Sequence, residues 1–208
     1  MNIRASTALA RRLLPLALLA SCAASGDEGD WFFRVGAHAV NPASDNGSLA
    51  GGTLDASIDT DVRPTLVLGR QLTPNWAIEL LASLPFQHTA SLNGADALDF
   101  KHLPPTLTLQ YYFAPEAKVN PFVGAGLNYT WTFDEEERGP LAGTRARVGN
   151  SFGPALHAGL VFDTGRRWNV IADVRWADID ADVRVDGAAV GTVNVDPLVY
   201  GIYLGWKF

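Results

Sequence analysis

Hydrophobic and polar residues alternate with a period of two along most of the chain beyond residue 30. In the stretch 123–133, Val123, Leu127 and Trp131 occupy one set of alternate positions, whereas glycine, asparagine and threonine fill the other. Because successive side chains of a β-strand point to opposite faces, this pattern predicts strands with one apolar face. We expect eight strands, at 31–40, 62–70, 76–86, 102–113, 121–133, 152–162, 168–176 and 195–208.

The connections between these strands alternate in length. Long loops rich in Gly, Asp and Ser are expected at 41–61, 87–101, 134–151 and 177–194, and short turns at 71–75, 114–120 and 163–167. Each strand is close to the roughly 9 to 11 residues that a tilted strand needs to cross a bilayer. Long loops on one side, with short turns and both chain ends on the other, are typical of outer-membrane barrels. The pattern predicts an all-β, eight-stranded antiparallel up-and-down transmembrane barrel.

A water-soluble β-sandwich is the alternative, since its apolar faces would pack on each other with the same period. Composition favours the barrel: the chain is 48% hydrophobic and only 18% charged, with 20 glycines, 12 prolines and six tryptophans. The last residue, Phe208, falls on the outward apolar face and resembles the C-terminal aromatic residue that barrel-insertion machinery recognises in bacterial outer-membrane proteins. Five tryptophans lie at expected strand ends, where interfacial girdles form: Trp31, Trp76, Trp131, Trp168 and Trp206.

The formal net charge of -6 argues against a nucleic-acid partner, which would require clustered basic residues. No apolar run approaches the roughly 18 to 20 residues of a spanning helix. These properties, together with the expected barrel, predict a protein of the bacterial outer membrane.

The N-terminal segment has the features of a secretory signal peptide, which we place at 1–24, with the barrel domain at 25–208. Arg11 and Arg12 precede an apolar stretch at 13–20, and small residues follow it. Cys22 is the only cysteine, so no intramolecular disulfide can form. Its setting resembles a lipoprotein lipobox, in which cleavage before Cys22 would leave a lipid-modified terminus. Ordinary cleavage after Ala24 is the alternative, and the sequence leaves both open.

Several motifs resemble the outer-membrane protein W family, which includes alkane-uptake relatives, and the likeness covers almost all of the chain after the signal peptide. They are "ELLASLPFQH" at 79–88, "HLPPTLTLQYYF" at 102–113, "PFVGAGLNYTWTFD" at 121–134, "ADIDA" at 177–181 and "VDPLVYGIYLGWKF" at 195–208. The resemblance implies a narrow, largely hydrophobic lumen and the passage of small hydrophobic molecules across the outer membrane, with lateral release into the bilayer.

Prolines cluster at the expected extracellular ends of strands, where each removes a ladder donor. Pro85 on the third strand should face Pro104 and Pro105 on the fourth. We interpret this as a gap in the wall, through which an apolar solute could leave the lumen sideways. The alternative is that these prolines only end strands and protect their edges.

The register also predicts which side chains point into the lumen. An eight-stranded barrel is just wide enough for side chains to fill it or to hold one small ligand, so no aqueous pore is expected. A polar plug should form because buried charges require partners, and plain barrel filling is the alternative for each residue. The expected polar residues are Arg34, Glu79, Asp173, Lys207, Arg175, His157 and Asn128; the expected apolar lining is Leu81, Tyr112, Phe122, Val161, Ile171 and Tyr203. Relatives tend to carry an aromatic residue near the position of Arg175.

Catalytic and metal-binding signatures are absent from the sequence. The four histidines lack metal-ligand spacing, and no HExxH, GxSxG or phosphate-binding loop occurs. We therefore expect no cofactor, no metal and no enzymatic activity. Two other functions stay open: an adhesive or structural barrel whose loops bind a partner, and a lipid-modifying enzyme that uses His157. The expected partners are outer-membrane lipid, a small hydrophobic solute and the barrel-insertion machinery, and the expected state is a monomer.

Overall fold

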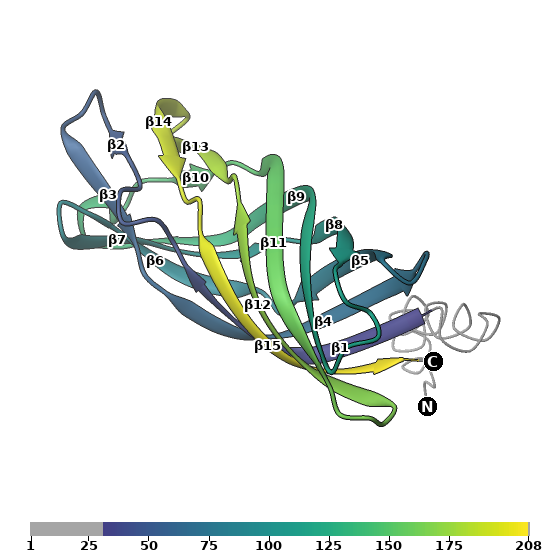
Figure 1. Cartoon of the computed structure of the whole chain (residues 1–208). Coiled ribbons are helices and arrows are strands. Elements are labelled where there is room, and N and C mark those ends of the chain that lie inside the picture. The colour runs from purple at the N-terminus through teal and green to yellow at the C-terminus, as the bar shows by residue number, and fades with distance from the viewer. Residues whose placement is uncertain (1–30, 208) are drawn as a thin grey trace, which may run out of the picture.

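The computed structural model describes residues 31–207, the side chain of Lys207 excepted, and these residues form a tall, closed β-barrel (Figure 1). Eight long antiparallel strands make the lower wall, each paired with the next, and the last pairs with the first. This confirms the fold class expected from the period of two. The eight strands are β1 (Trp31–Asn41), β4 (Asp61–Gln71), β5 (Trp76–Ser83), β8 (Thr106–Tyr112), β9 (Val119–Glu137), β11 (Ser151–Asp163), β12 (Trp168–Ala177) and β15 (Leu198–Lys207).

The outer face of this lower barrel is apolar and its inner face is packed. Leu107, Leu127 and Ile202 are about half exposed or more, whereas Val67 and Gln110 on inward positions are completely buried. The strands approach closely on the inside, where a Cβ at Gly126 would collide with the carbonyl oxygen of Leu107. Lipid contacts the outer band, because the wall has no second layer over it and the closed ladder satisfies the backbone.

The prediction of four long loops is wrong in one respect, because these segments contain further strands. They are β2 (Ser48–Leu49), β3 (Leu54–Ile58), β6 (Phe86–Leu92), β7 (Ala95–Leu103), β10 (Ala146–Val148), β13 (Asp180–Val185) and β14 (Ala188–Asn194). A short 3-10 turn at Gly139–Leu141 connects β9 to β10. The wall therefore continues past the membrane-spanning strands as an extension, made of β2, β3, β6, β7 and the end of β9 on one side and β10, β13 and β14 on the other.

Two tight hairpins build this extension. Asn93 and Gly94 join β6 to β7 with φ angles of 49° and 78°, and Asp186 and Gly187 join β13 to β14 with φ angles of 50° and 84°. Asn-Gly and Asp-Gly pairs favour these positive φ angles, which match the twist of a two-residue hairpin. Prolines mark the boundary between the lower barrel and the extension. The expected strand 76–86 is interrupted at Pro85, so that β5 and β6 are separate strands. The expected strand 102–113 is interrupted at Pro104–Pro105, so that β7 and β8 are also separate.

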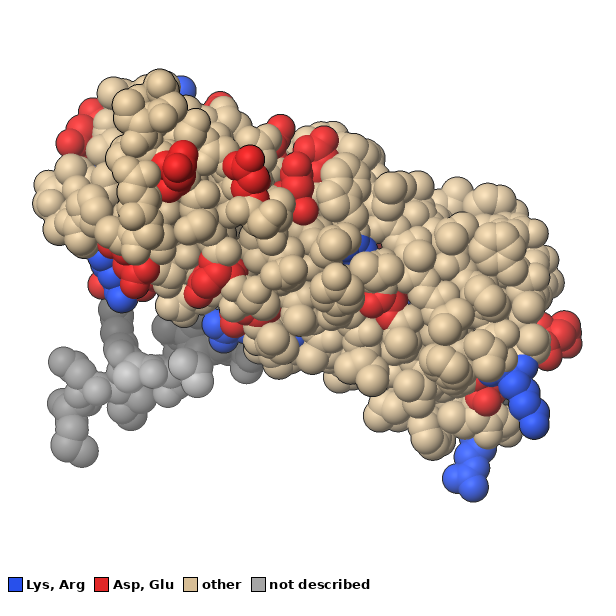
Figure 2. Space-filling model, turned by 60° about the vertical axis from the view of Figure 1, so that its left-hand side comes forward, with Lys and Arg blue, Asp and Glu red and all other residues tan. Residues whose placement is uncertain are grey.

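The extension is organised like a soluble protein. Its interior is an apolar cluster that includes Leu49, Ala97, Ile179 and Val183. Acidic side chains gather over one end of the molecule, and much of the remaining outer face is uncharged (Figure 2). The strands of the extension lie at the end opposite the C-terminus (Figure 1), so the extension is the part that projects beyond the bilayer.

The expected signal peptide at 1–24, Cys22 and Phe208 lie outside the described residues. Within 31–207, no helix is long and apolar enough to span a membrane.

Candidate functional site

A charged cluster occupies the middle of the lower lumen. Glu79 on β5 accepts hydrogen bonds from Arg34 Nη1 and Arg175 Nη2, each at 2.6 Å. Asp173 on β12 lies 2.8 Å from His157 Nε2 and 3.1 Å from Arg175 Nε. All five side chains are buried. Two carboxylates thus hold two guanidinium groups inside the barrel, which satisfies the requirement that buried charges be paired.

Neutral side chains extend this cluster across the lumen. Tyr112 accepts a hydrogen bond from Arg34 Nη2 at 2.7 Å and donates to Gln110 Oε1 at 2.7 Å. Gln110 Nε2 lies 2.9 Å from His157 Nδ1, and the hydroxyl of Tyr203 contacts His38 Nε2. We call this set the polar layer; it consists of Arg34, His38, Glu79, Gln110, Tyr112, His157, Asp173, Arg175 and Tyr203.

The polar layer contains most of the residues that the sequence assigns to a plug. Arg34, Glu79, Asp173, Arg175 and His157 meet there, from four different strands. Asn128 does not join them, because its side-chain nitrogen donates a hydrogen bond to Thr106 Oγ1 instead. The side chain of Lys207 lies outside the described part of the chain. His157 is enclosed by Gln110 and Asp173, so it presents no reactive nitrogen to lipid.

Two adjoining apolar cavities lie above the polar layer, and together we call them the chamber. The upper cavity, about 60 Å³, is enclosed by the extension and lined by residues such as Leu49, Phe100 and Val183. The lower cavity, about 40 Å³, reaches down to His38 and Arg175 of the polar layer. Each volume is a few times the roughly 10–15 Å³ that one water requires. His102 and Ile179 line both cavities and mark their junction.

The expected apolar lining separates into three groups. Leu81 lines the lower cavity of the chamber. Tyr112 and Val161 border a third, more polar cavity of about 220 Å³ below the polar layer. The remaining residues, Phe122, Ile171 and Tyr203, pack together in the buried core of the lower barrel, so their immediate role in the structure is barrel filling.

The period-two pattern did not identify several residues of the upper cavity, because it placed them in loops. Leu49, Leu92, Leu98 and Val183 belong to short strands of the extension. The Asn-Gly and Asp-Gly pairs were the available signal, since such pairs between alternating segments mark hairpins.

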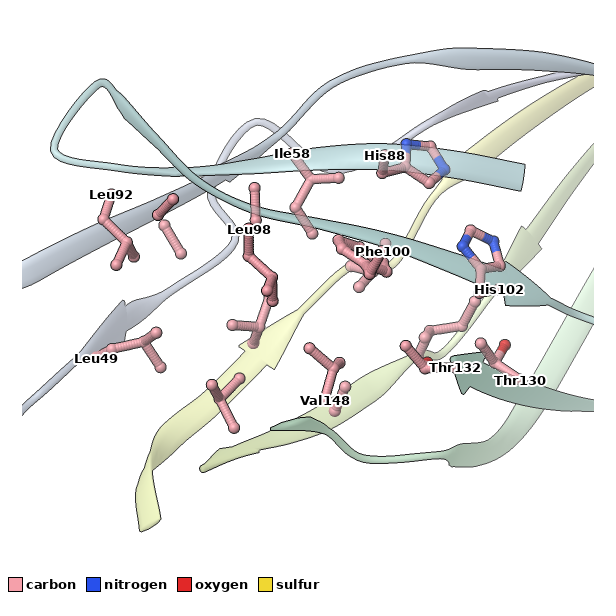
Figure 3. Close-up of a pocket in the computed structure, with 18 of the residues that line it drawn as sticks. Leu49, Ile58, His88, Leu92, Leu98, Phe100, His102, Thr130, Thr132 and Val148 are labelled. Atoms are coloured by element: carbon pink, nitrogen blue, oxygen red, sulfur yellow. The ribbon is translucent and has the colours of Figure 1, made fainter. Parts of the chain in front are cut away.

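A ladder of four rings lines one side of the chamber. Phe86 and His88 on β6 face His102 and Phe100 on β7 in cross-strand pairs. The His88 and His102 rings stack with centroids 5.0 Å apart and planes 8° apart, and Phe86 stacks on His102 at 5.4 Å. His88 and His102 lie side by side at one end of the pocket, away from Leu49 and Leu92 (Figure 3).

Electrostatics keep these two histidines uncharged. Burial lowers the pKa of His102 to about 3, and repulsion from a charged His88 adds to the effect. Burial also lowers the pKa of His88, although the hydrogen bond to the Asp59 carbonyl opposes this. Both imidazoles are therefore neutral at pH 7 and do not disturb the apolar character of the chamber.

The wall of the barrel is interrupted beside the lower cavity. The last pair of β5 with β8 is Leu81 with Thr106, and the first pair of β6 with β7 is Phe86 with His102. Between them, no ladder pair joins 82–85 to 103–105 in the described chain. All three prolines of the expected gap, Pro85, Pro104 and Pro105, lie in this interval, which we call the seam.

The seam is bounded by intact pairing on the β9 side. On the β4 side it is bounded by a backbone hydrogen bond from Leu84 N to Pro64 O at 3.1 Å and by a side-chain contact. Tyr129 N donates to Pro105 O at 3.0 Å, so β9 continues to pair. On the other side, Asp61 Oδ2 accepts from Gln87 N at 2.8 Å, which replaces a backbone partner with a carboxylate. Phe86, His102 and Pro104 line both the seam and the lower cavity.

Outside the barrel, the carboxylates of Asp178, Asp180 and Asp196 lie within 4.8 Å of one another. Burial and repulsion from the other two carboxylates raise the pKa of Asp178. These are the residues of the described chain whose spacing could accommodate a cation, and they lie apart from the chamber.

Known proteins resemble this chain over nearly its whole length. The OmpW family model matches residues 27–208. The chain is 34% identical to outer membrane protein W of Vibrio cholerae over 196 residues, covering 87% of this chain and 89% of that protein. It is 33% identical to outer membrane protein W of Escherichia coli K12 over 199 residues, covering 92% and 94%. The crystal structure of OprG from Pseudomonas aeruginosa has a TM-score of 0.76 and 30% identity, covering 88% and 98%.

The closed eight-stranded barrel, its lipid-facing band and these similarities lead to one conclusion: the chain belongs to the OmpW family and is a β-barrel of the bacterial outer membrane.

Proposed function

We propose that the protein passes small hydrophobic molecules across the outer membrane and releases them sideways into the bilayer. A solute enters the upper cavity, moves past the junction at His102 into the lower cavity, and leaves through the seam. The observation that carries this proposal is the position of the seam, which borders an apolar cavity directly above a charged layer.

The polar layer favours the sideways route over passage along the barrel axis. A solute moving toward the periplasmic end would have to separate Glu79 from Arg34 or Arg175 inside the barrel. Breaking a buried ion pair costs about 3–5 kcal/mol when one partner is lost, and an apolar solute offers nothing in return. At the seam, no backbone ladder has to break.

The proposed route of the solute also indicates what the protein contacts in the membrane. Outer-membrane lipid receives the solute, so the seam should face acyl chains rather than water. We propose that the chain acts as a monomer, since the apolar band runs around all eight strands and lipid alone satisfies it. Phe208 as the signal for barrel insertion and Cys22 as a lipid-attachment site remain proposals from the sequence.

Restoring backbone donors at the seam tests the proposal. The triple variant Pro85→Thr, Pro104→Val and Pro105→Thr should allow β5 and β8 to pair up to β6 and β7, and should reduce uptake of a radiolabelled alkane by cells that produce it. Pro154→Thr is the matched control, because Pro154 lies in an intact register with Leu127. Alkane uptake that is unchanged in a correctly folded triple variant would refute lateral release.

A further inference from the structure

His102 is a buried polar group without a partner. The residue is 5% exposed, and within the described chain neither ring nitrogen has a hydrogen bond or is fully enclosed. Burying a hydrogen-bonding group without a partner destabilises a protein, so such groups are rare and call for a physical explanation. The His102 ring also lies at the junction of the two cavities and lines both of them.

Other polar side chains of the chamber have at least one partner, although His88 Nε2 and Arg175 Nη1 are also buried without one. His88 Nδ1 lies 2.7 Å from the Asp59 carbonyl oxygen. Thr130 donates to Asn128 Oδ1 at 2.7 Å, and Thr132 Oγ1 lies 3.5 Å from the carbonyl oxygen of Gly149. Of the two residues that line both cavities, His102 and Ile179, His102 is the one that can form a hydrogen bond.

The chemistry of a neutral imidazole defines what it would bind. With its pKa at about 3 through burial and the neighbouring His88, His102 carries one N–H donor and one bare nitrogen acceptor at pH 7. A hydroxyl group matches both, and a carbonyl group matches the donor. The neighbouring rings of Phe86 and His88, which contact His102 and each other, add flat apolar surface next to these nitrogens.

We propose that His102 binds the hydroxyl or carbonyl group of an otherwise apolar solute on its way from the upper to the lower cavity. The chamber then selects small oxygenated hydrophobic molecules, flat aromatic alcohols above all, over the corresponding hydrocarbons. This inference rests on the proposed function, and it names the substrate class of the same path.

Uptake of 2-naphthol and naphthalene by cells that produce the protein tests the selectivity, because the two solutes differ only by a hydroxyl. His102→Phe keeps a stacked ring and removes both nitrogens, so it should lower 2-naphthol uptake about threefold to tenfold, the value of one hydrogen bond, and leave naphthalene uptake unchanged. His102→Gln keeps a donor and an acceptor and should retain most of the 2-naphthol uptake. Thr132→Val, which removes a hydroxyl that is already engaged, is the matched control.

A binding measurement separates the two levels of the proposal. The chain has four histidines, so the imidazole nitrogen signals of labelled protein in micelles can be assigned by substitution and followed during titration with 2-naphthol. We expect the His102 signals to shift with 2-naphthol and not with naphthalene. Equal loss of both uptakes in His102→Phe, or no shift at His102, would overturn this inference and leave the proposed function intact. If neither solute enters faster than in cells without the protein, the proposed function fails, and the titration alone decides whether His102 is a binding site.

Discussion

The lower barrel and the extension have opposite polarity. In the lower barrel, apolar side chains such as Leu107 and Ile202 lie outside, and the ion pairs of Glu79 lie inside. In the extension, Leu98 and Phe100 lie inside, and several acidic side chains lie on the outside (Figure 2). The same antiparallel wall is thus apolar on its outside in the lower barrel and apolar on its inside in the extension. The change occurs within single strands or pairs of strands.

This difference shows that the solvent around a sheet, and not the sheet itself, decides which face is apolar. Lipid requires an apolar outer face in the lower barrel, which leaves polar residues to fill the lumen. Water around the extension permits an acidic outer face, so the interior can be apolar. The chamber lies where the apolar interior of the extension meets the lower barrel. The polar layer, formed by the membrane-spanning strands, closes it from below.

The largest expected effect is the loss of the carboxylate at the centre of the polar layer. Glu79→Ala leaves Arg34 and Arg175 buried without their shared partner, and should lower the free energy of unfolding by about 3–5 kcal/mol. Urea titration of the protein in lipid vesicles, followed by tryptophan fluorescence, measures this. Glu136→Ala is the control, since the Glu136 side chain is 74% exposed and should matter little. Equal stabilities of the two variants would contradict a charged, closed lumen.

A charge placed on the outer face separates the two regions directly. Ile202→Arg, in the middle of the lipid-facing band, should lower the free energy of unfolding by about 2–4 kcal/mol. Ala188→Arg, on the exposed face of β14, should change it by less than about 0.5 kcal/mol. The same vesicle assay measures both, and a similar cost at the two positions would mean that the extension is also in contact with lipid.

Acidification should loosen the extension. The folded pKa values of His88 and His102 lie below the ordinary value of 6.5, so the unfolded hairpin binds more protons than the folded one below that pH. The stabilising effect is complete above about pH 6.5 and is lost as the pH falls toward 3. Amide hydrogen exchange in β6 and β7 should therefore give lower local opening free energies at pH 5 than at pH 7, after correction for intrinsic rates.

Asp61, a charged group that acts on both histidines, titrates in a different pH range. Although burial opposes it, hydrogen bonds from Gln87 N and Arg63 lower the pKa of Asp61 below its ordinary 3.8, so Asp61 stays ionised at pH 5. The variant with His88→Leu and His102→Phe should lose the pH dependence. If that variant retains it, the two histidines are not its source.

The lower barrel was predictable from sequence and the extension was not, for a physical reason. Lipid demands long, uninterrupted alternation, as in 121–133, and that signal is strong over 9 to 11 residues. The extension uses strands as short as Ser48–Leu49 and Ala146–Val148, and its alternation is interrupted by glycine and aspartate. Pairs such as Asn93-Gly94 do indicate hairpins, but within a segment that otherwise has the composition of a long loop they are weak signals.

The site was predictable in part for a similar reason. Period-two counting places Arg34, Glu79, Asp173 and Arg175 on the inner face, and their mutual pairing follows because buried charges require partners. Counting also places His102 inside, in phase with Thr106 and Gln110, but it does not show that the ring lies at the junction of two cavities. Which cavities a residue joins depends on how the extension folds over the barrel, and no local pattern records that.

The position of a bound apolar solute tests the central claim most directly, namely that the path ends above the polar layer. A nitroxide-bearing hydrocarbon added to the protein in bilayers broadens the amide signals of residues close to it. We expect broadening at Ala97 and Ile179 of the chamber, and none beyond that caused by solute in the lipid at Asn120 and Asn169, which line the cavity below the layer. Comparable broadening at Asn120 and Asn169 would show that the solute crosses the polar layer, and would contradict lateral release.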